Sequence, residues 1–306
     1  MMNLTGAILI TGGSGTLGHA IARAARAEGW DCRITIYSRS ELRQAEMRAR
    51  YPECRFVLGD VRDYDRLAAA MAGHDLVIHA AAMKRIPECE AQPGECYATN
   101  VGGSQNVVRA ALAAGVARVV GISTDKACAA ITTYGASKRL MEGLFQAASE
   151  RTVFTLCRYG NVLASNGSVI PIWRQQADRG EPLTITDRRM TRFWMTERQA
   201  VRTIELAAGV HAGAIVVPKM GALDILDVAR YAVGTHHIQT VETGLRSTEK
   251  LHEDLVHPYE SADNQAGNFL IFAGAPGGIT YTSETAPRID RHTFLAMLAE
   301  SETSGD

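Results

Sequence analysis

The sequence predicts an α/β protein with a doubly wound parallel sheet and a smaller, mixed α/β lobe. Three observations support this prediction. Short β-branched runs alternate with longer alanine-rich stretches of helical period through the first half of the chain. A glycine-rich segment follows the first of these runs. The chain has 306 residues, of which 46% are hydrophobic, so it can bury a large core.

The first half of the chain predicts strands and helices in strict alternation. Apolar runs predict strands at 7–11, 33–37, 55–58, 75–79 and 118–122, and a further strand at 153–158 that extends the sheet. Helical periodicity predicts helices at 16–29, 40–50, 63–72, 97–115 and 132–149. We therefore assign residues 1–161 to a dinucleotide-binding domain of the Rossmann type.

The second half of the chain is less regular and richer in Gly, Pro and Arg. It predicts helices near 197–209 and 224–234 and a strand near 214–217 that returns to the large sheet. We assign residues 162–306 to a substrate lobe, with segments that cross back to the first domain. The polar tail at 299–306 is predicted to be frayed.

Composition excludes several classes of function. A formal net charge of −1 provides no field that would recruit nucleic acid or an anionic membrane surface. No apolar run approaches the ~20 residues of a spanning helix, and the first residues show no signal peptide. The 6 cysteines include no Cys-x-x-Cys pair, which indicates a reducing cytoplasm. His252 and His257 lack the spacing of a helical zinc pair, so no metal site is expected.

The segment Thr11–Gly18, TGGSGTLG, predicts the cofactor site. It follows the first strand and opens a helix, so its glycines permit a tight turn and let backbone amides approach a pyrophosphate. The amino terminus of the helix stabilises that anion. Asp60 and Val61, after the third strand, are placed by the adenine, and Ala80 begins a wall of small residues after the fourth. Both could instead be packing positions.

The end of the second strand indicates which cofactor binds. A carboxylate at this point would bind the ribose hydroxyls of NAD. The chain has Ser38, Arg39 and Ser40 here, and arginine with hydroxyl groups suits the 2′-phosphate of NADP. The alternative is that Glu41 reaches back to the ribose of NAD. NADP is the predicted cofactor.

Two pairs of residues carry the predicted chemistry. Tyr134 and Lys138 are four apart, so they share one face of a helix, and the ammonium is expected to lower the phenol pKa. Asp125 and Lys126 directly follow the strand at 118–122, where ligands bind in open α/β sheets. The alternatives are a solvated helix pair and an exposed ion pair on a loop. Lys84 follows the fourth strand and could meet a phosphate or the nicotinamide, and Asn161 could bind a sugar hydroxyl.

Taken together, these residues resemble the extended short-chain dehydrogenase/reductase superfamily. The likeness covers residues 7–256 and is carried by TGGSGTLG, YSRSELRQAEM, GDVRD, HAAAMKRIPECE, STDKA, YGASK, RYGNV, TDRRMTRFW and EKLHE. Within the superfamily the chain is similar to the soluble, C5-inverting UDP-N-acetylglucosamine 4,6-dehydratases of the pseudaminic-acid pathway. Lys126 stands where most sugar-nucleotide dehydratases have a glutamate, and Tyr134, which long membrane-bound relatives commonly lack, is present.

The resemblance implies a mechanism and a set of site residues. Tyr134 and Lys138 would oxidise C4 of the sugar, Lys126, with a lowered pKa, would take the C5 proton, and Asp125 would protonate the departing 6-hydroxyl. The implied cofactor contacts are Gly12, Ser14, Gly15, Thr16, Leu17, Gly18, Ser38, Arg39, Ser40, Glu41, Leu42, Arg43, Asp60, Val61, Ala80, Lys84, Ile122, Ser123, Tyr134 and Lys138. The implied substrate contacts are Lys84, Asn161, Val169, Thr186, Arg246 and Glu249. Homodimers or hexamers are expected.

Two rival functions share this fold. A 4-epimerase or ketoreductase needs the tyrosine and the cofactor, but it has no use for an acid and a base after Thr124. A non-catalytic NADP-binding protein would have no need of Tyr134 and Lys138. The sequence therefore favours a dehydratase that acts on a nucleotide sugar.

Overall fold

The computed structural model describes residues 3–148, 151–163, 168–234, 239–265, 268–272 and 275–303. The alternation predicted for the first half of the chain is present. Six apolar runs form strands within two residues of their expected positions: β1 (Gly6–Thr11), β2 (Cys32–Ser38), β3 (Arg55–Leu58), β4 (Leu76–His79), β5 (Arg118–Ile122) and β6 (Val153–Cys157).

These six strands form a doubly wound sheet, which confirms the predicted fold class. They lie in the order β3-β2-β1-β4-β5-β6 and pair in parallel throughout. The order reverses between β1 and β4, and ligands of such sheets bind at the carboxyl ends of the strands beside this switch point. The residues that follow β1, β4 and β5 are therefore placed around one crevice.

The second half of the chain adds three strands to the same sheet. They are β10 (Ile215–Pro218), β14 (Ser261–Gln265) and β15 (Asn268–Phe272). β10 pairs with β6 in parallel, and β15 and β14 then continue the sheet in antiparallel fashion. The chain thus crosses from the lobe back to the large sheet, and residue 161 is no simple boundary.

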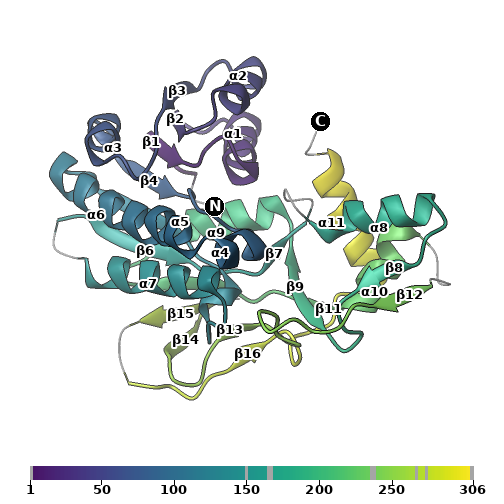
Figure 1. Cartoon of the computed structure of the whole chain (residues 1–306). Helices are drawn as coiled ribbons and strands as arrows, with labels where there is room; N and C mark the ends of the chain where they lie inside the picture. The colour runs from purple at the N-terminus through teal and green to yellow at the C-terminus, as the bar shows by residue number, and fades with distance from the viewer. Residues whose placement is uncertain are drawn as a thin grey trace.

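Helices cover both faces of the large sheet. α3 (Tyr64–Met71), α6 (Gly103–Ala114) and α7 (Thr133–Ala147) lie side by side on one face, and α1 (Thr16–Glu28) and α9 (Glu197–Ala207) contact each other on the other (Figure 1). α2 (Glu41–Arg50) packs against β2 and β3. Because both faces are covered, Ile10, Ile36 and Val120 are fully buried.

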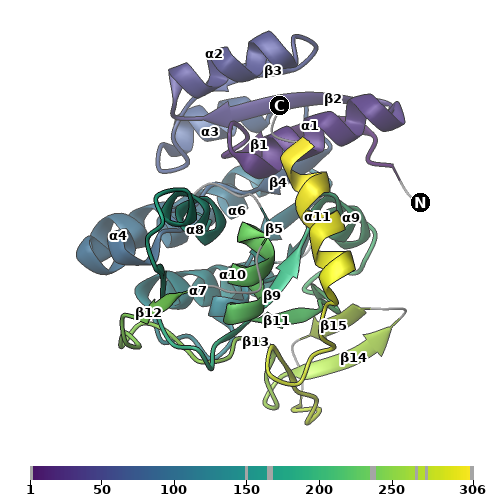
Figure 2. The same ribbon diagram turned by 90° about the vertical axis from the view of Figure 1, so that its right-hand side faces the viewer.

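The lobe has its own small core. β7 (Asn161–Val162), β9 (Thr191–Met195) and β11 (Ala222–Asp224) form one sheet, and β8 (Leu183–Ile185) pairs with β12 (Thr240–Glu242). Beside them lie α8 (Val169–Asp178), α10 (Ile225–Val233) and α11 (Arg291–Thr303) (Figure 2). Trp173, Trp194 and Phe294 are buried between these elements.

A last pair of strands, β13 (Asp254–Val256) and β16 (Tyr281–Thr282), lies outside this core. β13 contacts the turn that follows β5, so the C-terminal half of the chain reaches that turn.

The helix predicted at 97–115 differs from the one observed. The chain becomes helical earlier, in α4 (Ile86–Ala91) and α5 (Pro93–Tyr97), and a π-helical turn at Ala98–Gly102 precedes α6. Within the widened turn the amide of Asn100 donates to the Met83 carbonyl at 2.9 Å and to Ser137 Oγ at 2.9 Å. Asn100 thereby ties α7 to the segment after β4, a contact that the periodicity of the sequence does not reveal.

The polar end of the chain is more ordered than expected. Where the sequence predicts fraying from Ala299, helix α11 continues to Thr303, and residues 304–306 lie outside the described ranges. Ser301 is buried, and its hydroxyl donates to the Met297 carbonyl at 2.9 Å. Among the helices of the described residues, none combines the length and apolarity that a membrane span needs.

Candidate active site

The glycine-rich loop after β1 has the shape that the sequence predicts. Gly12 has φ +66°, and a Cβ there would lie 2.7 Å from the Cα of Ala81, at the end of β4. A Cβ on Gly18 would lie 1.8 Å from the Gly13 carbonyl oxygen, so only glycine lets α1 begin so close to the loop. Gly15 caps α1 without a side chain, which leaves the first helical amides to face an anion.

The residues after β2 lie at the far end of the cofactor crevice. Arg39 is half-exposed, with its Nη1 atom 3.6 Å from Asp60 Oδ2, so two predicted cofactor residues meet there. Ser40 caps α2 by accepting a hydrogen bond from the Arg43 amide at 3.3 Å. The Ser38 hydroxyl is turned inward, where it accepts from Gln44 Nε2 at 3.1 Å.

A short 3₁₀ turn at Asp125–Ala127 places the proposed acid and base directly after β5. Asp125 is fully buried, so the pair is not an exposed ion pair on a loop. Asp125 Oδ1 accepts from Thr124 Oγ1 at 2.9 Å and from Lys126 Nζ at 3.0 Å. Asp125 Oδ2 is buried and has no hydrogen-bond partner in the described part of the chain. One oxygen of this buried carboxyl group is thus hydrogen-bonded and the other is not. A buried oxygen without a hydrogen-bond partner costs free energy.

Helix α7 packs onto this turn and brings Tyr134 and Lys138 with it. A Cβ at Gly135 would lie 2.2 Å from the Lys126 carbonyl oxygen, so glycine is required for the contact. Tyr134 and Lys138 are both buried, which excludes a solvated helix pair. The fold thus brings Tyr134 beside Asp125 and Lys126, whereas Lys138 lies one helical turn further along α7, where its Nζ atom hydrogen-bonds to Met141 Sδ at 3.4 Å.

The pKa of Tyr134 differs from the sequence-based expectation. Burial raises it to about 12, and the nearby cation that lowers it is Lys126 and not Lys138. Burial also lowers the pKa of Lys138 to about 8, although the carboxylate of Glu142 opposes this change. The expectation of a lowered phenol pKa is therefore wrong, because burial outweighs the cation beside Tyr134.

The expected lowering of the Lys126 pKa is also wrong. Burial disfavours the ammonium, but the carboxylates of Asp125 and Glu253 outweigh it, and the pKa is raised. Lys126 Nζ lies 3.5 Å from Glu253 Oε1, in addition to its hydrogen bond with Asp125. The sequence suggested cationic neighbours, whereas the fold supplies two anionic ones. A free amine can therefore form only if its proton moves to a neighbouring group.

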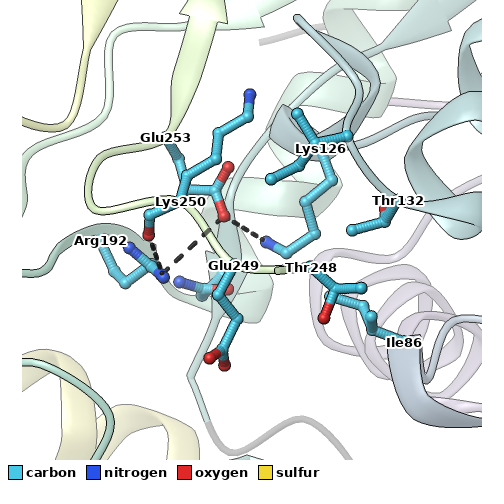
Figure 3. Close-up of a pocket in the computed structure, with 10 residues that line it drawn as sticks. Ile86, Lys126, Thr132, Arg192, Thr248, Glu249, Lys250 and Glu253 are labelled. Atoms are coloured by element: carbon cyan, nitrogen blue, oxygen red, sulfur yellow. Dashed lines mark hydrogen bonds and ion pairs between the residues drawn. The ribbon is translucent and has the colours of Figure 1, made fainter. Parts of the chain in front are cut away.

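Lys126 lines an open cleft of about 500 Å³ (Figure 3). Of the predicted substrate residues, Asn161 and Glu249 line the same cleft. Thr186 and Arg246 do not line it. The Thr186 carbonyl accepts from the Gly244 amide at 3.1 Å, and the Arg246 amide donates to Glu249 Oε2 at 3.4 Å, so Arg246 contacts a residue of the cleft wall. Val169 begins α8, and Lys84 is exposed after β4. Neither Val169 nor Lys84 is part of the cleft wall.

Sequence reasoning missed several residues of the site. Glu253 and Arg192 line the cleft, with Arg192 Nε 3.9 Å from Glu253 Oε1. Behind the turn, buried Arg158 makes paired hydrogen bonds with Glu142 and with Glu260, all at 2.7–2.8 Å. Glu253 lies in EKLHE and Arg158 in RYGNV, so two motifs that carry the resemblance contain these residues. Neither motif indicates which residues Glu253 and Arg158 contact in the fold.

The fold and the site together define a Rossmann-fold protein of the extended short-chain dehydrogenase/reductase class. The family follows from the sequence as a whole. A family described as "Polysaccharide biosynthesis protein" matches residues 8–273, and the chain belongs to it.

Named relatives fall into two groups. The chain is 41% identical over 263 residues to a UDP-N-acetylglucosamine 4,6-dehydratase (inverting) of Campylobacter jejuni, covering 83% of this chain and 78% of the relative. It is also 40% identical over 276 residues to a UDP-glucose 4-epimerase of Rickettsia bellii, covering 86% of this chain and 81% of that protein.

Solved structures agree with the fold. The X-ray structure of Pen from Bacillus thuringiensis has a TM-score of 0.88 and 31% sequence identity, and 99% of each chain is covered. DesIV of Streptomyces venezuelae, a dTDP-glucose 4,6-dehydratase with NAD and TYD bound, has a TM-score of 0.75 at 21% identity, with 97% of each chain covered.

Proposed function

We propose that this protein is a nucleotide-sugar 4,6-dehydratase that converts UDP-N-acetylglucosamine to a 4-keto-6-deoxy sugar nucleotide, with inversion at C5 and NADP as the resident cofactor. One observation carries the proposal: Lys126 Nζ, at the wall of the cleft, is hydrogen-bonded to the buried carboxylate of Asp125 at 3.0 Å, beside Tyr134. An acid and a base held together after β5 serve an elimination. The Campylobacter relative carries this activity in its name.

The first step is oxidation at C4. Tyr134, as phenolate, takes the proton of the 4-hydroxyl, and the hydride leaves C4. The bound cofactor supplies the hydride acceptor and, while oxidised, a positive charge beside the phenol. Lys126 already lowers the pKa of Tyr134, against the larger effect of burial. Lys138 holds the ribose of the cofactor in this arrangement.

The second step removes water across C5 and C6. Lys126 first passes one ammonium proton to Asp125 along their 3.0 Å hydrogen bond, which turns the ion pair into a neutral acid and a free amine. The net charge of the pair is unchanged, and burial favours the neutral form. The amine then takes the C5 proton, made acidic by the C4 ketone, while Asp125 gives its proton to the leaving 6-hydroxyl. Water departs, and the ion pair is restored.

In the third step C6 receives the hydride that left C4, and C5 takes up a proton. That proton arrives from the face opposite Lys126, which inverts C5. The proton that Tyr134 gained in the first step balances the one that C5 takes up. A bound nicotinamide would carry the hydride between the two carbons. Asn161, Glu249, Thr186 and Arg246 are the proposed substrate contacts on the cleft side of the lobe. We place the enzyme in the cytoplasm as a homo-oligomer.

The second candidate is a nucleotide-sugar 4-epimerase, which the name of the Rickettsia relative supports. Such an enzyme would use Tyr134 and the cofactor but would return the hydride to C4. It would have no use for the Asp125 and Lys126 pair, whose buried carboxylate leaves one oxygen without a partner in the described residues. The geometry therefore favours the dehydratase.

The reaction is tested by mass spectrometry of the nucleotide sugar. Purified protein given UDP-N-acetylglucosamine is expected to form a product lighter by one water, with no net accumulation of NADPH, because the hydride is stored and returned in each turnover. A product of unchanged mass that is epimeric at C4 would assign the protein to the epimerases instead.

Cofactor choice is tested at Arg39. Its half-exposed guanidinium directly follows β2, where a 2′-phosphate is predicted, and a charge-assisted hydrogen bond to a phosphate contributes roughly 1.5–3 kcal/mol. We expect Arg39→Ala to weaken binding of NADPH by tenfold or more and to leave binding of NADH nearly unchanged, as measured by fluorescence titration. Arg33→Ala, at the opposite end of β2 from Arg39, is the matched control. Equal losses for the two cofactors would favour NAD and the Glu41 alternative.

A further inference from the structure

The amine of Lys126 lies between two buried carboxylates that come from opposite halves of the chain. Asp125 approaches it from the turn after β5, at 3.0 Å, and Glu253 approaches it from the segment just before β13, at 3.5 Å. Glu253 is 4% exposed. The proposed mechanism uses Asp125 and gives Glu253 no task. Burying a carboxylate costs free energy unless a nearby cation compensates its charge. For Glu253 that cation is Lys126, which is the proposed base.

The backbone of Glu253 is firmly held. Its amide donates to Ser283 Oγ at 2.9 Å, and its carbonyl accepts from the Ser283 amide at 2.8 Å. Two residues further on, the Leu255 carbonyl accepts from buried Arg158 at 3.0 Å. Hydrogen bonds thus anchor the backbone around Glu253, and its carboxylate points toward Lys126 (Figure 3).

The two oxygens of Glu253 have different surroundings. Oε1 faces Lys126 Nζ and, at 3.9 Å, Arg192 Nε, whereas Oε2 is buried and has no hydrogen-bond partner in the described part of the chain. Arg192 donates hydrogen bonds to the carbonyls of Thr191, Leu251 and Lys250 and to Met190 Sδ, and none of these is with Glu253. The nearest cation for Glu253 is therefore Lys126.

We propose that Glu253 is a positioning residue for the base: its carboxylate holds the amine of Lys126 at the wall of the cleft and retains the proton that Lys126 shares with Asp125. This inference rests on the proposed dehydratase function, because it assigns a task in the elimination step. Without the carboxylate, the pair loses its shared proton more easily, and Asp125 then has no proton for the departing 6-hydroxyl.

The charges around Lys126 give the direction of the effect. The carboxylates of Asp125 and Glu253 favour the ammonium form of Lys126, whereas the guanidinium of Arg192 disfavours it. Tyr134 and Lys250 are further titratable groups near Lys126 and Glu253. Removing an opposite charge at this distance shifts a titration by about one to three pH units. Because Glu253 favours the protonated form, its removal makes the shared proton leave at a lower pH. Elimination should then fail at a lower pH. C4 oxidation depends on Tyr134 and should change less, because Glu253 acts on the phenol only through the charge of Lys126.

The test compares pH profiles of two steps in Glu253→Gln. Loss of water from UDP-N-acetylglucosamine reports elimination, and NADPH absorbance with the 6-deoxy analogue, which has no leaving group, reports C4 oxidation alone. We expect the alkaline limb of the elimination profile to move down by at least about one pH unit, with a smaller change in the C4-oxidation profile. Glu253→Asp keeps the negative charge on a side chain shorter by one methylene group. The alkaline limb of its elimination profile should therefore lie between those of Glu253→Gln and the wild type.

Glu284→Gln is the matched control, since Glu284 belongs to the same region and contacts His252, not Lys126. Its profiles should coincide with those of the wild type. Elimination limbs that coincide in the wild type, Glu253→Gln and Glu253→Asp would overturn the inference, and so would an equal shift in the C4-oxidation profile. A wild type that eliminates no water at any pH would instead remove the proposed function itself.

Discussion

Replacing Lys126 by alanine is expected to stop dehydration while C4 oxidation continues. Among the residues that the structure describes, only this amine and the Thr124 hydroxyl hydrogen-bond to Asp125 Oδ1. A positioned general base contributes about 10²- to 10⁴-fold to its step. Formation of the dehydrated product should therefore fall by at least about 100-fold. The 6-deoxy analogue should still reduce the bound cofactor, because Tyr134 and Lys138 remain, but this oxidation should move to higher pH, since loss of the Lys126 charge raises the pKa of Tyr134.

Exchange of the C5 proton with deuterated water isolates the step assigned to Lys126. Wild-type protein should exchange this proton in the 6-deoxy analogue once C4 is oxidised, and Lys126→Ala should not. Lys219→Ala, which removes an exposed lysine after β10, serves as the control and should exchange as the wild type does. Exchange at the normal rate in Lys126→Ala would show that another group is the carbon base.

The largest effect on stability is expected from Arg158→Met. Arg158 is fully buried and compensates two carboxylates, Glu142 and Glu260, with four hydrogen bonds. Removing one partner of a buried ion pair leaves an uncompensated charge and costs about 3–5 kcal/mol. The free energy of unfolding, measured by urea titration, should fall by this amount. Because Glu142 accepts from Ser123 Oγ at 2.7 Å, the loss should also loosen the strand end below the catalytic turn.

A matched variant and the pH dependence separate this effect from a general loss of packing. Arg26 makes the same paired contact with Glu53, but in solvent, so Arg26→Met should change stability far less. Burial raises the pKa of Glu260, but its hydrogen bonds with Arg158 outweigh burial and hold the pKa below its ordinary value. The contribution of Glu260 is therefore present above its unfolded pKa of about 4.3 and is lost as the pH falls. Equal losses in Arg158→Met and Arg26→Met would contradict this account.

The large sheet could be predicted because its physical cause is local. Parallel strands covered on both faces are continuous apolar runs, and β1, β4 and β5 begin and end within a residue or two of the runs that predict them. The glycine loop and the spacing of Tyr134 and Lys138 are local in the same sense. The π-helical turn at Ala98–Gly102 was missed because Asn100 reaches Met83 and Ser137, which are distant in sequence.

The electrostatics of the site could not be predicted, because they depend on distant partners. Asp125 and Lys126 are adjacent in the sequence, but Glu253 and Arg192 reach them only through the fold of the second half of the chain. In the sequence these two residues look like ordinary surface charges. With Asp125 and Glu253 beside it, the pKa of Lys126 is raised and not lowered as expected. Lys126 must therefore transfer a proton to Asp125 before elimination.

The fate of the hydrogen on C4 tests the central claim most directly. UDP-N-acetylglucosamine carrying deuterium at C4 should give a product lighter by one water, with the deuterium in the C6 methyl group, as read by NMR and mass spectrometry. That result requires a hydride that leaves C4, is retained in the site during the elimination at Asp125 and Lys126, and is then transferred to C6. Deuterium recovered at C4 in a sugar of unchanged mass would contradict the account.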